Sequence, residues 1–240
     1  MKYILDVHTH TIASGHAYNT MREMAKAASE KGLELLGITE HSMSMPGTCQ
    51  LFYFENLKMV EREMYGVELL LGAELNIMDY RGRVDMEEKT LKTMDITIAS
   101  MHIPCIKPGT REENTNAYLE VMKNPYINII GHPDDARYEV DYLALVQGAR
   151  EHGILLEVNN NSLDPRCTRM GGEENIRTML KYCREYQVPV VVNSDAHTDT
   201  LVGNHCYGEK IIEDMDFPQE LVVNGSVQEL KKYVNKFKNL

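Results

Sequence analysis

The chain alternates between short, nearly continuous apolar runs and longer helix-like segments. Apolar runs of this length predict strands that are buried on both faces. We expect seven strands, at 3–7, 34–39, 68–75, 95–100, 127–131, 154–158 and 189–193, with 221–223 as a weak eighth. Helices are expected at 20–31, 52–65, 112–123, 139–152, 173–186 and 226–237.

The first predicted helix has recognisable ends. Thr20 and Glu23 have the spacing of a capping box, and Gly32 reads as a C-terminal stop. Strands that alternate with helices in this way specify a largely parallel sheet with helices outside it. The sheet is then either an open, doubly wound sheet or a closed barrel.

The length of 240 residues fits a single domain spanning 1–240, because α/β barrels of about 200–250 residues are routinely one domain. No linker, low-complexity tract or internal repeat divides the chain. The formal charge of −11 and the pI near 5.3 argue against a protein whose main task is to bind a nucleic-acid backbone.

The N-terminal sequence lacks the apolar core of a secretory signal, and no later stretch is long and apolar enough for a membrane span. The five cysteines are odd in number, widely spaced and contain no C-x-x-C motif. Such a pattern fits reduced thiols better than a disulfide framework or a zinc ribbon. We therefore expect a cytoplasmic protein with no membrane partner.

Most of the nine histidines stand at or just beyond the end of a predicted strand, and carboxylates stand among them. Side chains two apart on an extended segment share a face, so the two imidazoles of His8-Thr9-His10 can reach one ion. Asp195 and His197 repeat that spacing after the last strand. The candidate metal ligands are His8, His10, His16, His41, Glu74, His102, His132, Asp195 and His197.

A single histidine is more often a surface or satisfied core residue than a ligand, so this prediction rests on the joint placement of the set. His152 lies at a predicted helix C-terminus, where an imidazolium complements the helix dipole, and it is assigned no function. His205 falls in a loop and reads as a surface residue or a support for the ligands. Cys49 and Cys105 read as packing residues, because no local signature marks either as a nucleophile.

The placement of these side chains also decides whether the sheet is open and doubly wound or closed into a barrel. Six strands side by side at roughly 4.8 Å span about 24 Å, which is too far for side chains on all their ends to meet at one cluster. A sheet that curls and closes brings those ends together at its C-terminal rim. We therefore predict a distorted seven-stranded (β/α)7 barrel in the α/β class.

Nine ligands exceed what one ion needs, since a catalytic zinc takes about three protein ligands. They would serve two or three ions, with at least one bridging carboxylate. A mainly imidazole set favours zinc, with manganese or iron as alternatives, over magnesium or calcium. Ions roughly 3.5–4 Å apart activate water and polarise phosphoryl groups, so no protein nucleophile is required and none is named.

At this point the motifs resemble those of the PHP (polymerase and histidinol phosphatase) superfamily, most closely its YcdX-type phosphatases, over essentially the whole chain. The motifs are His8-Thr9-His10, Thr39-Glu40-His41, Glu74, His102, Gly131-His132-Pro133 and Asp195-Ala196-His197. One departure is Glu40, where relatives more often place Asp; it would alter hydrogen bonding around the ligands without removing one.

The resemblance implies a distorted seven-stranded barrel with three divalent ions per chain, which hydrolyses phosphate monoesters through a metal-activated hydroxide. The first ion would take His8, His10, Glu74 and Asp195, the second His16, His41 and His197, and the third His102 and His132 with Glu74 bridging. Asn159 and Asn160 are candidate substrate contacts. Arg81 and Arg137 are candidates as well, although solvated surface explains the two arginines better.

The expected partner is a small phosphorylated metabolite, and a homo-oligomer stays open. Three other functions also stay open: a histidinol phosphatase, a PHP-type nuclease or phosphodiesterase, and a metal-binding regulatory protein without turnover. The acidic charge and the absence of an appended domain argue against the nuclease.

Overall fold

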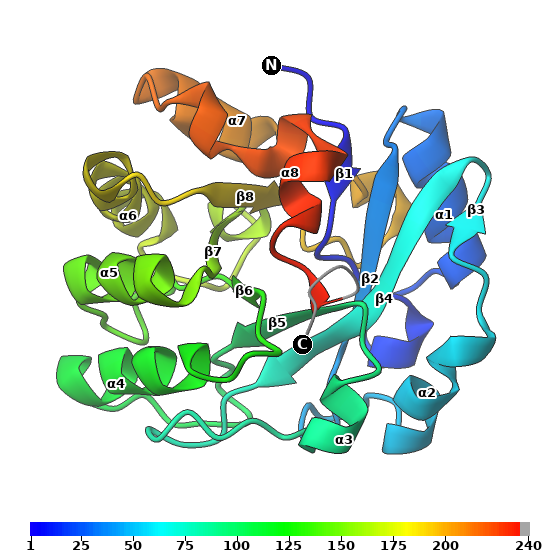
Figure 1. The fold of residues 1–240 in the computed structure, drawn as a ribbon, viewed down its shortest axis with the longest axis horizontal. Helices are drawn as coiled ribbons and strands as arrows, with labels where there is room; N and C mark the ends of the chain where they lie inside the picture. The colour runs from blue at the N-terminus through cyan, green and yellow to red at the C-terminus, as the bar shows by residue number, and fades with distance from the viewer. Residues whose placement is uncertain (236–240) are drawn as a thin grey trace.

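The computed structural model describes residues 1–235 and consists of a nearly closed ring of parallel strands with helices outside it (Figure 1). Neighbouring strands pair in the order β1, β2, β4, β5, β6, β7, β8. Their bounds are Leu5–Asp6, Leu35–His41, Val67–Asn76, Ile96–Ser100, Ile129–Ile130, Leu155–Asn159 and Val190–Asn193. The seven predicted strands and the (β/α)7 barrel are therefore confirmed.

The ring closes through the segments that follow its first and last strands. The amide of His10 donates to the Ala196 carbonyl at 2.9 Å, and Thr9 and Ala196 form an isolated parallel bridge. On the same seam, the Val7 amide donates to Asn193 Oδ1 at 3.0 Å. Closure thus brings the residues after β1 against the residues after β8, which are far apart in sequence.

Helices cover the outside of the ring (Figure 1). They are α1 (Met21–Glu30), α2 (Leu51–Asn56), α3 (Glu88–Leu91), α4 (Arg111–Met122), α5 (Tyr142–His152), α6 (Gly172–Tyr186) and α7 (Cys206–Asp214), whereas α8 (Val227–Lys231) packs over one end of the barrel. The predicted capping box is present, since Thr20 and Glu23 exchange side-chain and backbone hydrogen bonds at the start of α1. Among residues 1–235, no helix is both long and apolar enough to span a lipid bilayer.

The prediction of a helix over 52–65 is wrong for the second half of that range. It ends with α2 and the 3₁₀ turn Leu57–Met59, and β3 (Glu63–Met64) follows as an antiparallel partner of β4. Tyr65 and Gly66 both have positive φ, at 54° and 77°, which is the geometry of a tight two-residue hairpin. A dipeptide that permits such a turn overrides the helical pattern around it.

The C-terminal segment plugs one end of the barrel. The weak eighth strand over 221–223 is not formed: 3₁₀ turns occupy Gln219–Leu221 and Val223–Gly225, and only Val222 bridges to Val190. Val223, Leu230 and Val234 belong to one apolar cluster with the first residues of several strands, such as Leu35 and Ile96. Residues 236 and 237 of the last predicted helix lie outside the described part. Apolar side chains thus fill the barrel at the N-terminal ends of its strands, and the polar side chains lie at the rim formed by the C-terminal ends.

Candidate metal centre

Glu74 lies at the centre of the polar rim. It is fully buried in β4 and stands opposite His41 of β2 in the sheet register. Five imidazole nitrogens approach its two oxygens: those of His8 at 3.4 Å, His10 at 3.5 Å, His41 at 2.7 Å, His102 at 3.2 Å and His132 at 2.9 Å. The strands therefore direct five predicted ligands at one carboxylate.

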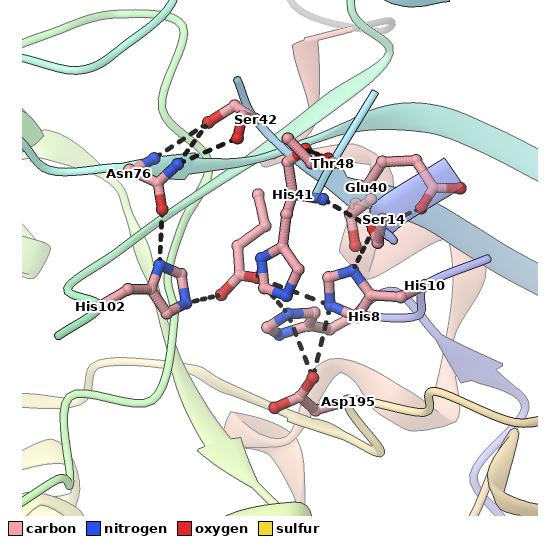
Figure 2. A network of polar contacts seen from close by, with 12 residues as sticks. His8, His10, Ser14, Glu40, His41, Ser42, Thr48, Asn76, His102 and Asp195 are labelled. Carbon is pink, nitrogen blue, oxygen red and sulfur yellow. Dashed lines mark hydrogen bonds and ion pairs between the residues drawn. The ribbon is translucent and has the colours of Figure 1, made fainter. Parts of the chain in front are cut away.

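Asp195 forms a second meeting point beside the first. Its Oδ1 lies 3.7 Å from His8 Nε2, 3.4 Å from His10 Nε2 and 3.6 Å from His197 Nδ1. Figure 2 shows His8 and His10 beside the Asp195 carboxylate, and the Nε2 atoms of both also lie within 3.5 Å of Glu74. His16 joins through ring contacts, with centroids 4.8 Å from His41 and 4.9 Å from His197. All nine predicted ligands thus converge on one rim of the barrel.

Several of these atoms are buried without a hydrogen bond. They are His8 Nε2, His10 Nε2, His41 Nδ1, His102 Nε2 and Glu74 Oε2. A buried polar atom that lacks a partner is costly, and the usual explanation is a ligand or ion that it binds. Three sets of ligand atoms lie within 4.8 Å of one another: His8, His10 and Glu74; His10, His41 and His197; His41, Glu74 and His102. The donor set fits divalent metal ions.

Neighbouring polar groups fix which nitrogen of His10 and of His102 faces inward. Ser14 Oγ donates to Glu40 at 2.6 Å, so it is free to accept from His10 Nδ1 at 3.2 Å (Figure 2). His102 Nδ1 in the same way lies 2.8 Å from Asn76 Oδ1. In both cases the Nε2 lone pair is left for an ion. The Glu40 departure noted in the sequence thus supports the hydrogen bonding around the centre.

Burial and neighbouring charges shift the pKa values of several groups at the rim in different directions. Burial opposes ionisation of Glu74, but His102, His8 and His41 hold its pKa well below the ordinary value. Burial lowers the pKa of His10, and it lowers that of His16 to about 4. His8 is the exception, because the carboxylates of Glu157, Glu74 and Asp195 outweigh burial and raise its pKa. An ion binding at His8 must therefore displace a proton.

Two residues of the centre were not predicted from the sequence. Glu157 of β7 is fully buried, and its Oε1 lies 2.7 Å from His8 Nδ1. Its signal was present, since a carboxylate in an apolar strand needs a partner, as at Glu74. Arg169 had no such signal, because it lies in a polar loop; its Nη2 donates to Asp195 Oδ2 at 2.9 Å.

The backbone also contributes. His132 and Asp195 have φ values of 28° and 53°, in the left-handed region that non-glycine residues rarely adopt. Asp6 fixes the second of these turns, since its carboxylate accepts from the amide and hydroxyl of Ser194. Strain of this kind is retained where a side chain must point in one direction.

A cavity of about 410 Å³ opens onto the centre. His16, His41, His102, His197 and Arg169 are among its lining residues. Arg137 lines it as well, whereas Arg81 is exposed and is not among its lining residues. The cavity gives a small molecule access to the converging ligands.

The two asparagines predicted as substrate contacts are buried and occupied by protein partners. Asn159 Nδ2 donates to Glu157 and Asp195, and its Oδ1 accepts from Arg169 Nη1. Asn160 Oδ1 accepts from the amides of Tyr207 and Gly208 at the start of α7. Neither lines the cavity. Their substrate contacts stay a prediction.

The other two histidines differ from each other. His152 ends α5 and is exposed. His205 is buried against the Tyr3 ring, with Nε2 4.0 Å from Asp6 Oδ1. Because Asp6 supports Ser194, His205 lies behind the centre and takes no part in its converging set.

Asp134 gives a stability prediction. Neither carboxylate oxygen has a well-formed hydrogen bond, and burial raises its pKa from 3.8 to about 7, although Arg169 and Ser162 act in the opposite direction. A raised carboxyl pKa destabilises the fold increasingly as pH rises from the unfolded to the folded value. D134N removes that cost. The difference in free energy of unfolding between D134N and the wild type should therefore be about 2–3 kcal/mol more favourable to D134N at pH 8 than at pH 5.

Urea unfolding at the two pH values measures this difference. The neighbouring D135N is the control, because Arg137 holds the pKa of Asp135 below its ordinary value against the effect of burial. That substitution should instead cost stability at pH 8. An equal effect of D134N at both pH values would contradict the prediction.

Comparisons with known proteins agree with this geometry. A family model described as the PHP domain matches residues 6–161. A protein of Clostridium novyi named a probable phosphatase is 45% identical over 98% of this chain and 95% of its own length. A protein of the same name from Caldanaerobacter subterraneus is 43% identical over 98% of this chain and 92% of its own length.

Two solved structures share the fold. One is the histidinol phosphate phosphatase of Lactococcus lactis complexed with zinc, L-histidinol and phosphate, with a TM-score of 0.63 and 18% identity over 90% of this chain and 95% of that one. The other belongs to an archaeal ribonuclease P with mature tRNA, with a TM-score of 0.59 and 16% identity over 96% of this chain and 90% of that one.

Proposed function

Because the chain belongs to the PHP domain family, we propose that it is a metal-dependent phosphatase that hydrolyses phosphate monoesters. The observation that carries the proposal is the crowding of buried imidazole nitrogens around the Glu74 carboxylate, beside an open cavity. We extend the assignment over residues 1–240 as one domain, since similarity to the named phosphatases covers 98% of the chain.

The proposed metal ligands are those expected from the sequence. The first ion takes His8, His10, Glu74 and Asp195, the second His16, His41 and His197, and the third His102 and His132 with Glu74. The geometric set of His8, His10 and Glu74 supports the first of these directly. His41 and His197 fall together in another set, as do Glu74 and His102.

Three divalent ions are proposed, and zinc is favoured because imidazole nitrogens dominate the donors. The zinc named with the Lactococcus lactis enzyme supports that choice, and manganese or iron is the alternative. When bound, ions of this kind lower the pKa of water and polarise phosphoryl oxygens. A protein nucleophile is then unnecessary.

The remaining residues hold this arrangement and bind the substrate. Arg169 fixes Asp195 through Oδ2, which leaves Oδ1 directed at His8 and His10. Asn159 donates to the same oxygen at 3.2 Å. Arg169 also lines the cavity, so its guanidinium is placed to bind phosphoryl oxygens that the ions leave uncovered.

Phosphate release from 4-nitrophenyl phosphate tests the proposal. Freshly purified protein should be active, chelated protein inactive, and protein reloaded with zinc or manganese active again. Equal rates on single-stranded DNA would favour a nuclease, and rates on histidinol phosphate far above those on generic monoesters would favour a histidinol phosphatase. No turnover in any metal state would sink the phosphatase and leave a metal-binding protein without catalysis.

A further inference from the structure

Arginine side chains stand beside the histidines in the lining of the cavity. Arg137, Arg166 and Arg169 all line it, and Asp135 is the one Asp or Glu among its lining residues. The chain as a whole carries a formal charge of −11. The lining of the cavity is therefore richer in cationic than in anionic side chains, unlike the chain as a whole.

Two of these arginines are held in place by buried or nearly buried carboxylates. Arg137 donates from Nε and Nη2 to Asp135, whose side chain is 4% exposed. Arg166 donates from Nε and Nη2 to Asp164, whose side chain is 10% exposed. In neither arginine does Nη1 donate to another described residue. A guanidinium fixed on one edge presents its other donors to an anion at little further entropic cost.

The reacting phosphate does not account for these two arginines. The proposed ions, together with Arg169, which contacts the proposed ligand Asp195, supply the charge that a phosphoryl group needs. Arg137 and Arg166 belong to the segments 133–137 and 164–169, and neither contacts a proposed ligand. Their donors are thus available for a different group of the same substrate.

Size and shape favour a small molecule. About 410 Å³ is within the range of metabolite sites, which is roughly 300–1,000 Å³. Met45, Ile103 and Pro104 form an apolar part of the lining, which suits a short carbon skeleton. A polynucleotide would need a basic path continuing beyond the cavity, and the acidic chain argues against one.

We propose that the physiological substrate is a small phosphomonoester with a second anionic group, a carboxylate or a second phosphate, which Arg137 and Arg166 bind while the first phosphate is hydrolysed. This inference rests on the proposed phosphatase function and narrows its substrate class. The apolar lining then contacts the carbon atoms that join the two anions.

Matched substrate pairs test it with the zinc- or manganese-loaded enzyme. Glycerol 3-phosphate and 3-phosphoglycerate differ in a carboxylate, and fructose 6-phosphate and fructose 1,6-bisphosphate differ in a phosphate. In at least one pair, kcat/KM should be about tenfold higher for the ester with two anions, mainly through KM. The pair that shows the preference identifies the second anion.

Variants assign that preference to the arginines. R137Q, R166Q and the double variant should reduce the ratio of kcat/KM within the pair toward one. R137K should keep part of it, because the charge remains and the fork is lost. The Arg166 side chain is 76% exposed, so R166Q is not expected to disturb the fold. R166Q therefore still tests the inference if the R137Q protein does not fold.

R177Q is the matched control. The Arg177 side chain is 35% exposed and pairs with Glu173, much as the 32% exposed Arg137 pairs with Asp135, but it lies outside this cavity. It should leave the ratio unchanged. No preference in either pair, a preference that survives the double variant, or stronger turnover of an oligonucleotide with a terminal phosphate would each overturn the inference. Failure to hydrolyse any monoester would instead overturn the phosphatase function itself.

Discussion

Replacing Glu74 with Gln is expected to lower kcat for a phosphate monoester by roughly 10³-fold, or about 4 kcal/mol in the barrier. Five imidazole nitrogens lie within 3.5 Å of this carboxylate, and two proposed ions share it. Gln keeps the size of the side chain but removes its charge and one acceptor oxygen. The variant should therefore lose metal as well as turnover.

Metal content per chain, measured by elemental analysis beside kcat, checks this expectation. E68Q is the matched control, because Glu68 lies on the same strand and contacts Lys231 away from the rim. It should keep wild-type metal content and rate. An E74Q protein with full metal content and near wild-type turnover would refute the bridging role of Glu74.

Metal removal is expected to lower the melting temperature as well as the activity. An ion held at 100 times its Kd stabilises the folded state by about 2.7 kcal/mol. A domain of this size shifts by about 2–4 °C per kcal/mol, so loss of a single ion should lower Tm by roughly 5–10 °C. Chelation leaves buried carboxylates and imidazoles facing one another without the charge that they were arranged to bind.

The size of this Tm difference should depend on pH. The pKa of His8 is raised in the metal-free centre by Glu157, Glu74 and Asp195 against the effect of burial. An ion must therefore compete with a proton that becomes harder to displace as pH falls through that raised pKa. The gap between loaded and chelated protein should shrink from pH 8 to pH 5.

Thermal unfolding with and without chelator, followed by readdition of zinc or manganese, measures the gap. Readdition should restore the original Tm, which separates metal loss from irreversible damage. An unchanged Tm after chelation, with metal content shown to have fallen, would contradict a structural contribution from the ions.

These two predictions probe the centre in different ways. E74Q removes a protein ligand, so it asks whether Glu74 is shared between ions. Chelation removes the ions from an unaltered chain, so it asks whether they contribute to the fold. Agreement between metal content, Tm and kcat in both experiments would tie the buried polar cluster at the barrel rim to catalysis.

The sequence by itself determined the order of the elements and the set of residues at the rim. Apolar runs of strand length gave the seven parallel strands, because a strand buried on both faces needs apolar residues throughout. Side chains at the C-terminal ends of parallel strands meet when the sheet closes, so His8, Glu74 and Asp195 could be predicted to lie together. Both signals are local in the chain.

Only the tertiary structure decided which groups support that set. Glu157 reaches His8 across 149 residues of sequence, and Arg169 reaches Asp195 from a loop with no periodic pattern. The hairpin at Tyr65 and the left-handed turn at Asp195 depend on backbone dihedral angles that the sequence pattern does not show. Contacts of this kind arise from closure of the barrel, because a hydrogen bond between distant segments exists only after the ring has brought them together.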